Sequence, residues 1–268
     1  MKLIPSWKKN DLAKPIFFNS FCSHVINHVT TGPIGTNKTL TVKRDIIPQA
    51  LIRGYQVLIV DVENEYTRYK DFSPVLELDL VSRELISKIL NTEAVYIDTL
   101  VRCLRSQPRD WDLVIKNDSL SQGQELLVIQ GIKRIKEILE YRDGVKIFDY
   151  LNKNRIGRII LNPDYQVIQL ILIILTVMKQ YKDRLKKYLG TVIIMEEMET
   201  LIDLDKDRRY IPTATNQGRK RSIFLYYISH EPMSRMLRNP YWGSAVFNFD
   251  SITIYSMTDK KEVVLHDR

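Results

Sequence analysis

The sequence predicts an α/β protein in which helices cover a mostly parallel sheet, and three features of the chain support this. Residues 56–61 (QVLIVD) and 191–195 (TVIIM) are short, β-branched runs whose interior positions are all apolar. Such runs are typical of strands that are buried on both faces of a parallel sheet. A turn with two glycines, residues 32–35, lies between strand-like and helix-like segments. Strands that alternate with helices in this way predict a sheet covered by helices.

The first third of the chain is predicted as strand, strand, helix, strand. Residues 15–21 (PIFFNSF) and 24–30 have the composition of short strands, and residues 38–53 have that of a helix. Gly54 follows this helix, as expected of a residue that caps its end in a left-handed conformation. Pro48 lies inside the helix and has no backbone N–H group, so we expect a kink or an early end near Ile47.

The rest of the chain is mostly helical up to its last third. Within residues 82–151, segments such as 84–90 and 125–141 place apolar residues three and four positions apart. Residues 167–189 are expected to form one long helix that ends at Gly190. Two further strands are expected at 222–229 and 251–257.

The composition of the chain indicates where the protein is located more clearly than it indicates its function. The 268 residues carry a formal net charge of +8, with a pI near 9.3. This balance permits contact with nucleic acid or with an anionic membrane surface, and it selects neither. The most apolar run, residues 167–178, is too short to cross a bilayer, which needs about 20 residues. The N-terminal segment has no signal-peptide pattern, and the chain has only two cysteines, so we expect a cytoplasmic protein.

Residues 32–39 (GPIGTNKT) are close to the phosphate-loop pattern of glycine, four residues, glycine, lysine, then serine or threonine. Gly32, Lys38 and Thr39 match, Gly35 adds an inner glycine, and Asn37 replaces the second required glycine. Glycines let backbone N–H groups turn toward phosphate oxygens at the start of a helix. Lys38 is expected to reach the terminal phosphates, and the Thr39 hydroxyl to bind Mg²⁺. The residues expected to bind the nucleotide are Gly32, Pro33, Ile34, Gly35, Thr36, Asn37, Lys38, Thr39 and Leu40.

Asn37 departs from the phosphate-loop pattern, but asparagine is the residue that replaces this glycine with the least strain. Asparagine is among the few residues other than glycine that tolerate a positive φ angle. An alternative interpretation is a Gly-Pro turn followed by a helix that is capped by threonine or asparagine. The flanking strand and helix, and the second buried strand ending at Asp61, favour the phosphate loop.

A second candidate site follows the strand at 191–195. Glu196 and Glu197 come directly after it, at the end where ligands bind in open α/β sheets. We expect Glu196 to orient Mg²⁺ and Glu197 to activate the attacking water. The alternative is that both glutamates begin a solvated helix, where acids in the first turn are favourable. The phosphate loop elsewhere in the chain favours the catalytic interpretation.

With these residues identified, the chain resembles the ATPase domain of conjugative type IV secretion systems, the class that contains the VirB-four, TraC and TrbE proteins. This class belongs to the HerA/FtsK-like group of P-loop ATPases. The resemblance covers residues 15 to about 262 and rests on several motifs in the family's order. They are the strand 15–21, the loop GPIGTNKT, the segment 54–66 (GYQVLIVDVENEY), the run VIIMEEMETLID, the segment 216–221 (NQGRKR), the strand 227–232 (YISHEP) and the closing strands 243–261.

The resemblance implies a RecA-like P-loop NTPase core with a mostly parallel sheet, flanking helices and an α-helical insertion. It implies one domain over residues 1–268, with the core at about 15–74 and 166–262 and the insertion at about 75–165. The implied ligands are ATP and Mg²⁺, with Arg219 or a neighbouring basic residue reaching the nucleotide of another subunit and His230 as a sensor. The implied partners are further copies of the chain (a hexamer in the family), secretion-channel components and DNA, with peripheral association at the inner face of the cell membrane.

Three departures from the family keep other interpretations open. Asn37, Glu196 and His230 stand where the family has glycine, aspartate and glutamine. They favour an alternative in which the chain is a catalytically weak or inactive nucleotide-binding scaffold of the same apparatus. A HerA/FtsK-like DNA translocase, and an unrelated α/β protein that binds DNA by its basic surface, are further alternatives.

Two other groups of titratable residues are candidate sites. Cys22, His24 and His28 lie close in sequence, but no second cluster completes a zinc site. Three acids lie at or after the strand 56–61, and the family places one of them near the nucleotide: Asp61, Glu63 and Glu65.

Overall fold

The computed structural model describes residues 2–4, 28–31, 37–77, 80, 83–90, 96–106, 110–139, 144–196, 214–215, 217–230, 251–255 and 262–266, and all structural statements below concern these residues. The expected strand at 15–21, the loop residues 32–36 and Glu197 lie outside them.

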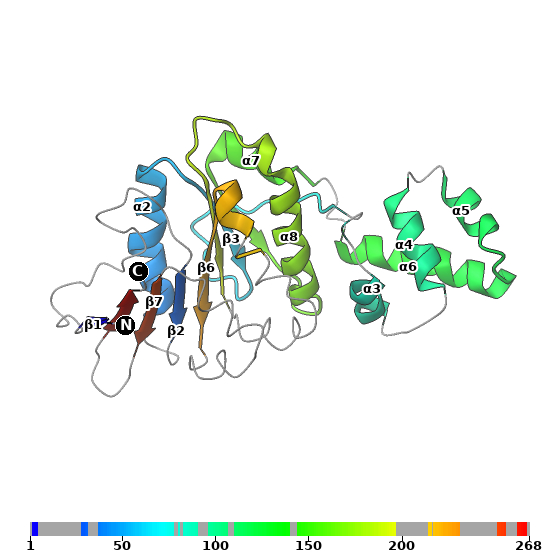
Figure 1. The fold of residues 1–268 in the computed structure, drawn as a ribbon, viewed down its shortest axis with the longest axis horizontal. Helices are drawn as coiled ribbons and strands as arrows, with labels where there is room; N and C mark the ends of the chain where they lie inside the picture. The colour runs from blue at the N-terminus through cyan, green and yellow to red at the C-terminus, as the bar shows by residue number, and fades with distance from the viewer. Residues whose placement is uncertain are drawn as a thin grey trace.

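One eight-stranded sheet forms the centre of the fold, in the order β1-β8-β7-β2-β6-β5-β3-β4 (Figure 1). The strands from β7 to β4 are all parallel, and β8 is antiparallel to both of its neighbours. This confirms the predicted mostly parallel sheet. The strand bounds are β1 Lys2–Ile4, β2 His28–Thr31, β3 Gln56–Asp61, β4 Ile156–Ile160, β5 Thr191–Met195, β6 Ile223–Ser229, β7 Ser251–Tyr255 and β8 Glu262–His266.

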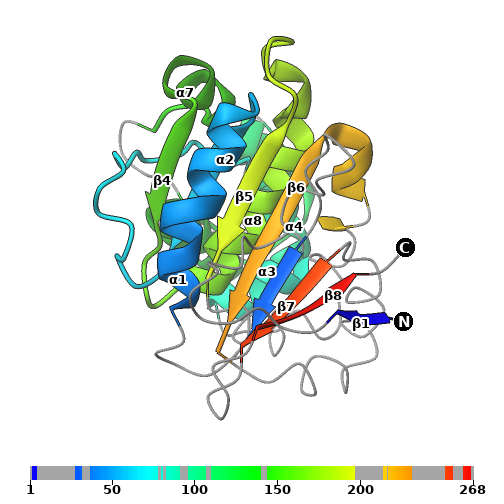
Figure 2. The same cartoon turned by 90° about the vertical axis from the view of Figure 1, so that its left-hand side faces the viewer.

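Helices cover both faces of the sheet (Figure 2). Their bounds are α1 Lys38–Thr41, the π-helical turn η1 Val42–Ile46, α2 Ile47–Ile52, α3 Arg83–Leu90, α4 Ile97–Arg105, α5 Trp111–Asn117, α6 Gln122–Leu139, α7 Ile147–Asn154 and α8 Gln166–Gln180. Because successive residues of a strand point to opposite faces, each central strand contributes to two cores. In β3, Val57 and Ile59 pack with the helical run from α1 to α2, whereas Leu58 and Val60 pack with α7 and α8.

The helix after the phosphate loop continues through Pro48 instead of ending near Ile47. The Ile47 N–H group bonds to the Val42 carbonyl, five residues back, so the turn before Pro48 is π-helical. This wider turn changes the hydrogen-bond register just ahead of the residue that has no N–H group to donate. Gly54 ends the helix as expected: its φ is +89°, and it donates to the Leu51 carbonyl at 3.0 Å.

The expected long helix over 167–189 is wrong in its second half. α8 ends at Gln180, and only the short 3₁₀ turn η4 (Tyr181–Asp183) follows it. Arg184 then donates to the Ser222 carbonyl at 3.1 Å, and the Leu185 N–H group donates to the Asn152 side chain at 3.1 Å. These contacts with distant parts of the chain override the amphipathic pattern that predicted a helix.

The helices α3 to α6 form a group beside α8, at the end of the molecule away from β1 (Figure 1). Their buried residues belong to the same apolar cluster as α8 and one face of the sheet. The close approach of α4 and α6 occurs at Gly131, where an added Cβ would lie 2.4 Å from Leu100 Cδ1. Within the expected insertion of 75–165, this helical group occupies residues 83–139, whereas α7 and β4 belong to the sheet layers.

Candidate nucleotide-binding site

Several of the expected site residues lie at the edge of the sheet where the parallel strands end. Thr31 of β2 is level with Ser229 of β6, and the next residue after Ser229 is His230. Met195 of β5 is level with Val60 of β3, so Glu196 is level with Asp61. The chain leaves β2 toward β3 on one side and leaves β6 toward β7 on the other. Such a reversal of strand order is where open α/β sheets bind ligands.

The helix that begins at Lys38 starts at this edge. Asn37 has φ 61° and ψ 24°, the left-handed conformation that asparagine tolerates better than other non-glycine residues. Its carbonyl accepts the Thr41 N–H group at 3.0 Å, so Asn37 forms the cap of the helix. Lys38 in the first turn is only 3% exposed. The backbone at position 37 thus adopts the conformation for which a phosphate loop normally uses glycine.

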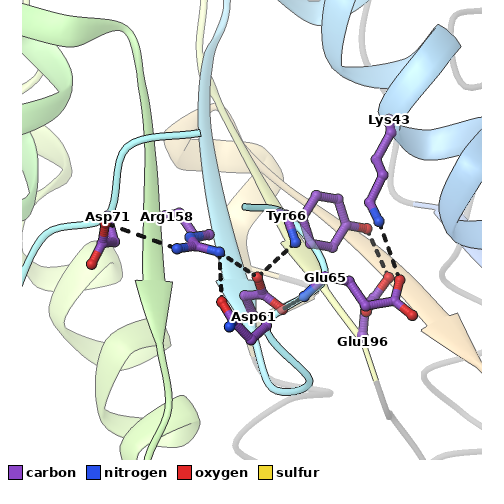
Figure 3. A network of polar contacts seen from close by, with 8 residues as sticks. Lys43, Asp61, Glu65, Tyr66, Asp71, Arg158 and Glu196 are labelled. Carbon is purple, nitrogen blue, oxygen red and sulfur yellow. Dashed lines mark hydrogen bonds and ion pairs between the residues drawn. The ribbon is translucent and has the colours of Figure 1, made fainter. Parts of the chain in front are cut away.

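Glu196 connects the helix start, β5 and the loop after β3. The Tyr66 hydroxyl donates to Glu196 Oε1 at 2.8 Å (Figure 3), and the Thr39 hydroxyl donates to the same carboxylate. Glu196 is 4% exposed and Tyr66 is fully buried. The two residues expected to bind Mg²⁺, Thr39 and Glu196, are therefore neighbours in the fold, although 157 positions separate them in the sequence.

Burial raises the pKa of Glu196 to about 7. The hydrogen bonds from Tyr66 and Thr39 oppose this by stabilising the carboxylate, while the negative charges of Glu65 and Asp61 raise the pKa further. Glu65 pairs with Lys43 of η1 at 3.3 Å, and the Lys43 ammonium lies 4.8 Å from the centre of the Tyr66 ring. Glu196 is thus buried beside two other acids, and a divalent cation bound there would supply positive charge.

These residues fit Mg²⁺. A threonine hydroxyl and a carboxylate are hard oxygen donors of the kind that Mg²⁺ prefers, and it binds through few protein ligands when nucleotide phosphates supply others. Thr39 and Glu196 would hold the ion at the start of α1, and the ion would neutralise phosphate charge. Within the described residues there is no cluster of His, Cys, Asp and Glu that could hold a metal alone, and Cys22 and His24 lie outside them.

We expect Glu196→Gln to stabilise the metal-free protein at alkaline pH. The folded pKa of about 7 exceeds the unfolded value of 4.5, so the folded state binds more protons, and wild-type stability falls as pH rises from about 4.5 through 7. Glutamine does not ionise, so the variant does not lose this stability. The difference in free energy of unfolding between the variant and the wild type should therefore grow by about 2–3 kcal/mol between pH 5 and pH 8. Urea denaturation across this range measures it. The exposed Glu63→Gln is the control, and equal pH dependence in wild type and Glu196→Gln would contradict the assignment.

Asp61 ends β3, as the sequence predicts, and its contacts give it a structural role. It is fully buried, and its two carboxylate oxygens accept the N–H groups of Glu65 at 3.0 Å and Tyr66 at 2.9 Å. Arg158 of β4 donates to it at 3.3 Å and to Asn64 at 2.9 Å. The carboxylate therefore folds the loop after β3 back on itself and places the Tyr66 hydroxyl at Glu196 (Figure 3).

Sequence reasoning missed Tyr66 and Arg158. Tyr66 ends the segment 54–66 that carries part of the resemblance, but the sequence does not reveal its role, because its contact with Glu196 spans 130 residues. Arg158 stands alone as a charge in the apolar run IGRII. A single charge in a buried strand requires a partner of opposite charge. Asp61, at the end of another buried strand, is such a partner, and this pairing could have been predicted from the sequence.

The remaining expected residues are placed as follows. His230 follows β6 at the same edge as Glu196 and is partly buried. Leu40 is 53% exposed on the outer side of α1. Arg219 lies in the 3₁₀ turn η5 (Arg219–Arg221) before β6, at the opposite edge of the sheet. Arg219 therefore does not join the site of its own chain.

Comparison with known proteins gives structural relatives only. No protein-family model and no curated protein matches the chain. The chain is similar to VirB4 of Thermoanaerobacter pseudethanolicus, with a TM-score of 0.56 and 14% identity, over 87% of this chain and 78% of that one. It is similar to the plasmid coupling protein TrwB in complex with ADP and Mg²⁺, with a TM-score of 0.54 and 11% identity, over 87% and 71%. The chain is also similar to the unbound form of the conjugative coupling protein TrwB, with a TM-score of 0.55 and 11% identity, over 87% of this chain and 69% of that one.

At such low identity these likenesses establish the fold. The predicted fold class is confirmed, because the structural similarity covers 87% of this chain and 69% and 78% of the two relatives. The described chain has the fold of VirB4 and TrwB, with a mostly parallel sheet flanked by helices.

Proposed function

We propose that this chain is an ATP-binding, ATP-hydrolysing motor domain that energises the transfer of DNA or protein through a conjugative type IV secretion apparatus. One observation carries the proposal. Thr39 at the start of the helix after the loop donates a hydrogen bond to Glu196 at the end of β5. A phosphate loop and an acid that holds Mg²⁺ must meet at this point for a nucleotide to be bound and hydrolysed.

Each residue has a distinct task in this proposal. Lys38 neutralises the terminal phosphates, and Thr39 and Glu196 hold Mg²⁺ against them. Glu197 accepts a proton from the water that attacks the γ-phosphate, and the leaving group is ADP. Tyr66 keeps the Glu196 carboxylate in place through its hydrogen bond of 2.8 Å. The complex of TrwB with ADP and Mg²⁺ supports nucleotide binding by this fold.

Assembly of several copies belongs to the same proposal. Arg219 lies at the edge of the sheet opposite Lys38 and Glu196, so it can act only on a nucleotide held by another copy. A ring of copies, six if it follows the conjugative family, would provide that arrangement. The described residues include no helix that is long and apolar enough to span a membrane.

A nucleotide-binding scaffold that does not turn over is the second candidate, and Glu196 favours it. A carboxyl group with a pKa of about 7 is partly protonated at neutral pH, and a protonated carboxyl group is a poor metal ligand. Asn37 adds a side chain beside the expected phosphate position. Both features would weaken hydrolysis while leaving the fold intact.

Asn37→Gly distinguishes the two candidates. We expect slow ATP hydrolysis by the wild type and a several-fold gain in the variant, because glycine adopts the left-handed conformation without strain and lets the backbone approach phosphate. Steady-state phosphate release measures it. Ser119→Gly is the matched control, since Ser119 also has a positive φ, of 51°, but lies between α5 and α6.

Two results would change this account. Fast hydrolysis that Asn37→Gly leaves unchanged would remove the weakness assigned to Asn37 and would exclude the scaffold. Failure of both proteins to bind ATP would contradict the proposed function, and the fold would then serve another purpose.

A further inference from the structure

The strand that leads into the phosphate loop is joined to its neighbour by a buried hydrogen bond between two side chains. Thr30 of β2 stands two positions before Gly32, where the phosphate-loop motif begins. Its hydroxyl lies 2.7 Å from the Tyr226 hydroxyl of β6, the strand beside β2 (Figure 1). Thr30 is 2% exposed and Tyr226 is 1% exposed. The bond therefore joins β2 to β6 in a region where water does not compete for it.

This bond supplies a contact that the backbone pairing of the two strands does not. In the parallel register of β2 with β6, Thr30 is level with Ile228, whereas Tyr226 is level with His28. Residues two positions apart share one face of a sheet, so the Tyr226 ring extends along that face toward the end of β2. The Tyr226 hydroxyl therefore lies nearer to the start of the phosphate loop than the Tyr226 backbone does.

Tyr226 is also a neighbour of Tyr66, the residue that donates to Glu196. Both tyrosines belong to the apolar cluster between the helical run from α1 to α2 and one face of the sheet, together with Val192 and Ile194 of β5. Burial raises the pKa of Tyr66 well above its usual value, and the charges of Glu196 and then Tyr226 raise it further. In the sheet, β6 lies between β2 and β5. Tyr226 is therefore placed to relate the phosphate-loop strand to the strand that carries Glu196.

We propose that Tyr226 is a positioning residue for nucleotide binding, which holds the start of the phosphate loop at a fixed place relative to Glu196. The inference rests on the proposed function, because it assigns Tyr226 a role in the affinity for nucleotide. A phosphate loop binds through backbone N–H groups that must already point toward the phosphate oxygens, so loosening the strand before the loop lowers the affinity. Tyr226 acts through Thr30 and does not itself touch phosphate or metal.

Equilibrium binding of ATP with Mg²⁺ to variants that lack one hydroxyl tests the proposal. Tyr226→Phe should lower the affinity for ATP about fivefold, the value of one hydrogen bond lost from a preorganised site. Thr30→Val removes the partner hydroxyl at nearly the same volume and should cause a similar loss, whereas Thr30→Ser keeps the hydroxyl and should restore the affinity. Because the two hydroxyls act as a pair, the double variant Tyr226→Phe, Thr30→Val should lose about fivefold and not about 25-fold.

Tyr227→Phe is the matched control. Tyr227 is the next residue of β6 and is fully buried, but it points to the opposite face of the sheet, where its hydroxyl lies 3.4 Å from the Thr215 hydroxyl. Tyr227→Phe should leave the affinity for ATP unchanged. Circular dichroism and the melting temperature show that each variant is folded. The comparison separates affinity from stability, because a purely structural role for Tyr226 would give both tyrosine variants the same affinity.

The dependence of binding on Mg²⁺ identifies the part of the site on which Tyr226 acts. Tyr66→Phe removes the hydrogen bond to Glu196, so it should weaken ATP binding only when Mg²⁺ is present. Tyr226→Phe should weaken ATP binding by the same factor with Mg²⁺ and with EDTA, because Thr30 leads into the loop that contacts the phosphates. A loss in Tyr226→Phe that occurs only with Mg²⁺ would overturn the assignment of Tyr226 to the phosphate loop.

Three further results would contradict the proposal, and they separate it from the proposed function. Equal affinities of Tyr226→Phe and Tyr227→Phe for ATP would overturn the role of Tyr226 and leave the proposed function standing, since the wild type would still bind ATP. Additive losses in the double variant would show that the hydroxyls of Thr30 and Tyr226 act separately. No binding of ATP by the wild type would contradict the proposed function itself, and the role of Tyr226 would fail with it.

Discussion

Arg158→Met should lower the free energy of unfolding by about 3–5 kcal/mol. Arg158 is 6% exposed and Asp61 is fully buried, so the substitution leaves a buried carboxylate without its cation. Two backbone N–H groups still bind that carboxylate, but they do not replace a guanidinium charge. Chemical denaturation at neutral pH measures the loss.

The controls separate the buried pair from an ordinary surface pair. Arg83→Met breaks the exposed pair of Arg83 with Asp98, at 3.0 Å, and should cost less than about 1 kcal/mol. Asp61→Asn combined with Arg158→Met should recover part of the stability, because no uncompensated charge remains. A loss in Arg158→Met no larger than that in Arg83→Met would show that the pair does not hold the loop after β3.

Glu197→Gln should lower the rate of ATP hydrolysis by about 10²-fold or more and leave ATP affinity unchanged. Glu197 follows Glu196, whose carboxylate meets Thr39 at the expected Mg²⁺ position. A glutamine keeps the size and polarity of the side chain but cannot accept the proton of the attacking water. Single-turnover hydrolysis and equilibrium nucleotide binding, measured on the same preparations, distinguish the two effects.

Glu137→Gln is a suitable control for Glu197→Gln, because Glu137 is an exposed acid of α6. It should leave turnover unchanged. Turnover that hardly changes in Glu197→Gln would instead favour the interpretation in which Glu196 and Glu197 only begin a helix.

The fold could be predicted where local pattern and final environment agree. β3 and β5 are buried along their whole length, and both were visible as uninterrupted apolar runs. β4 was missed, because Gly157 and Arg158 interrupt its pattern. Gly157 is required there by the rings of Phe72 and Tyr150, 2.7 Å from an added Cβ. The segment 181–189 was predicted as helix because its amphipathic pattern is real, but Asn152 and Ser222 hold it in another conformation.

The candidate site likewise has some residues that local sequence motifs indicate and others whose roles depend on contacts between distant parts of the chain. Motif spacing predicts Asn37, Thr39 and Glu196 as site residues, because a phosphate loop and a strand-end acid have sequence patterns of their own. Spacing could not reveal that Tyr66 donates to Glu196, since the partners come from different strands of the folded sheet. It also could not show that Asp61 is occupied by Arg158 and is therefore removed from nucleotide chemistry.

The most direct test of the central claim is the melting temperature of the protein with and without ATP and Mg²⁺, in wild type and in Lys38→Ala. A ligand at about 100 times its dissociation constant stabilises the folded state by about 2.7 kcal/mol, so the wild type should melt several degrees higher with nucleotide. Lys38→Ala should show no such shift, whereas Lys116→Ala, an exposed lysine of α5, should shift like the wild type. Equal shifts in all three proteins, or no shift in any of them, would contradict a nucleotide site at Lys38.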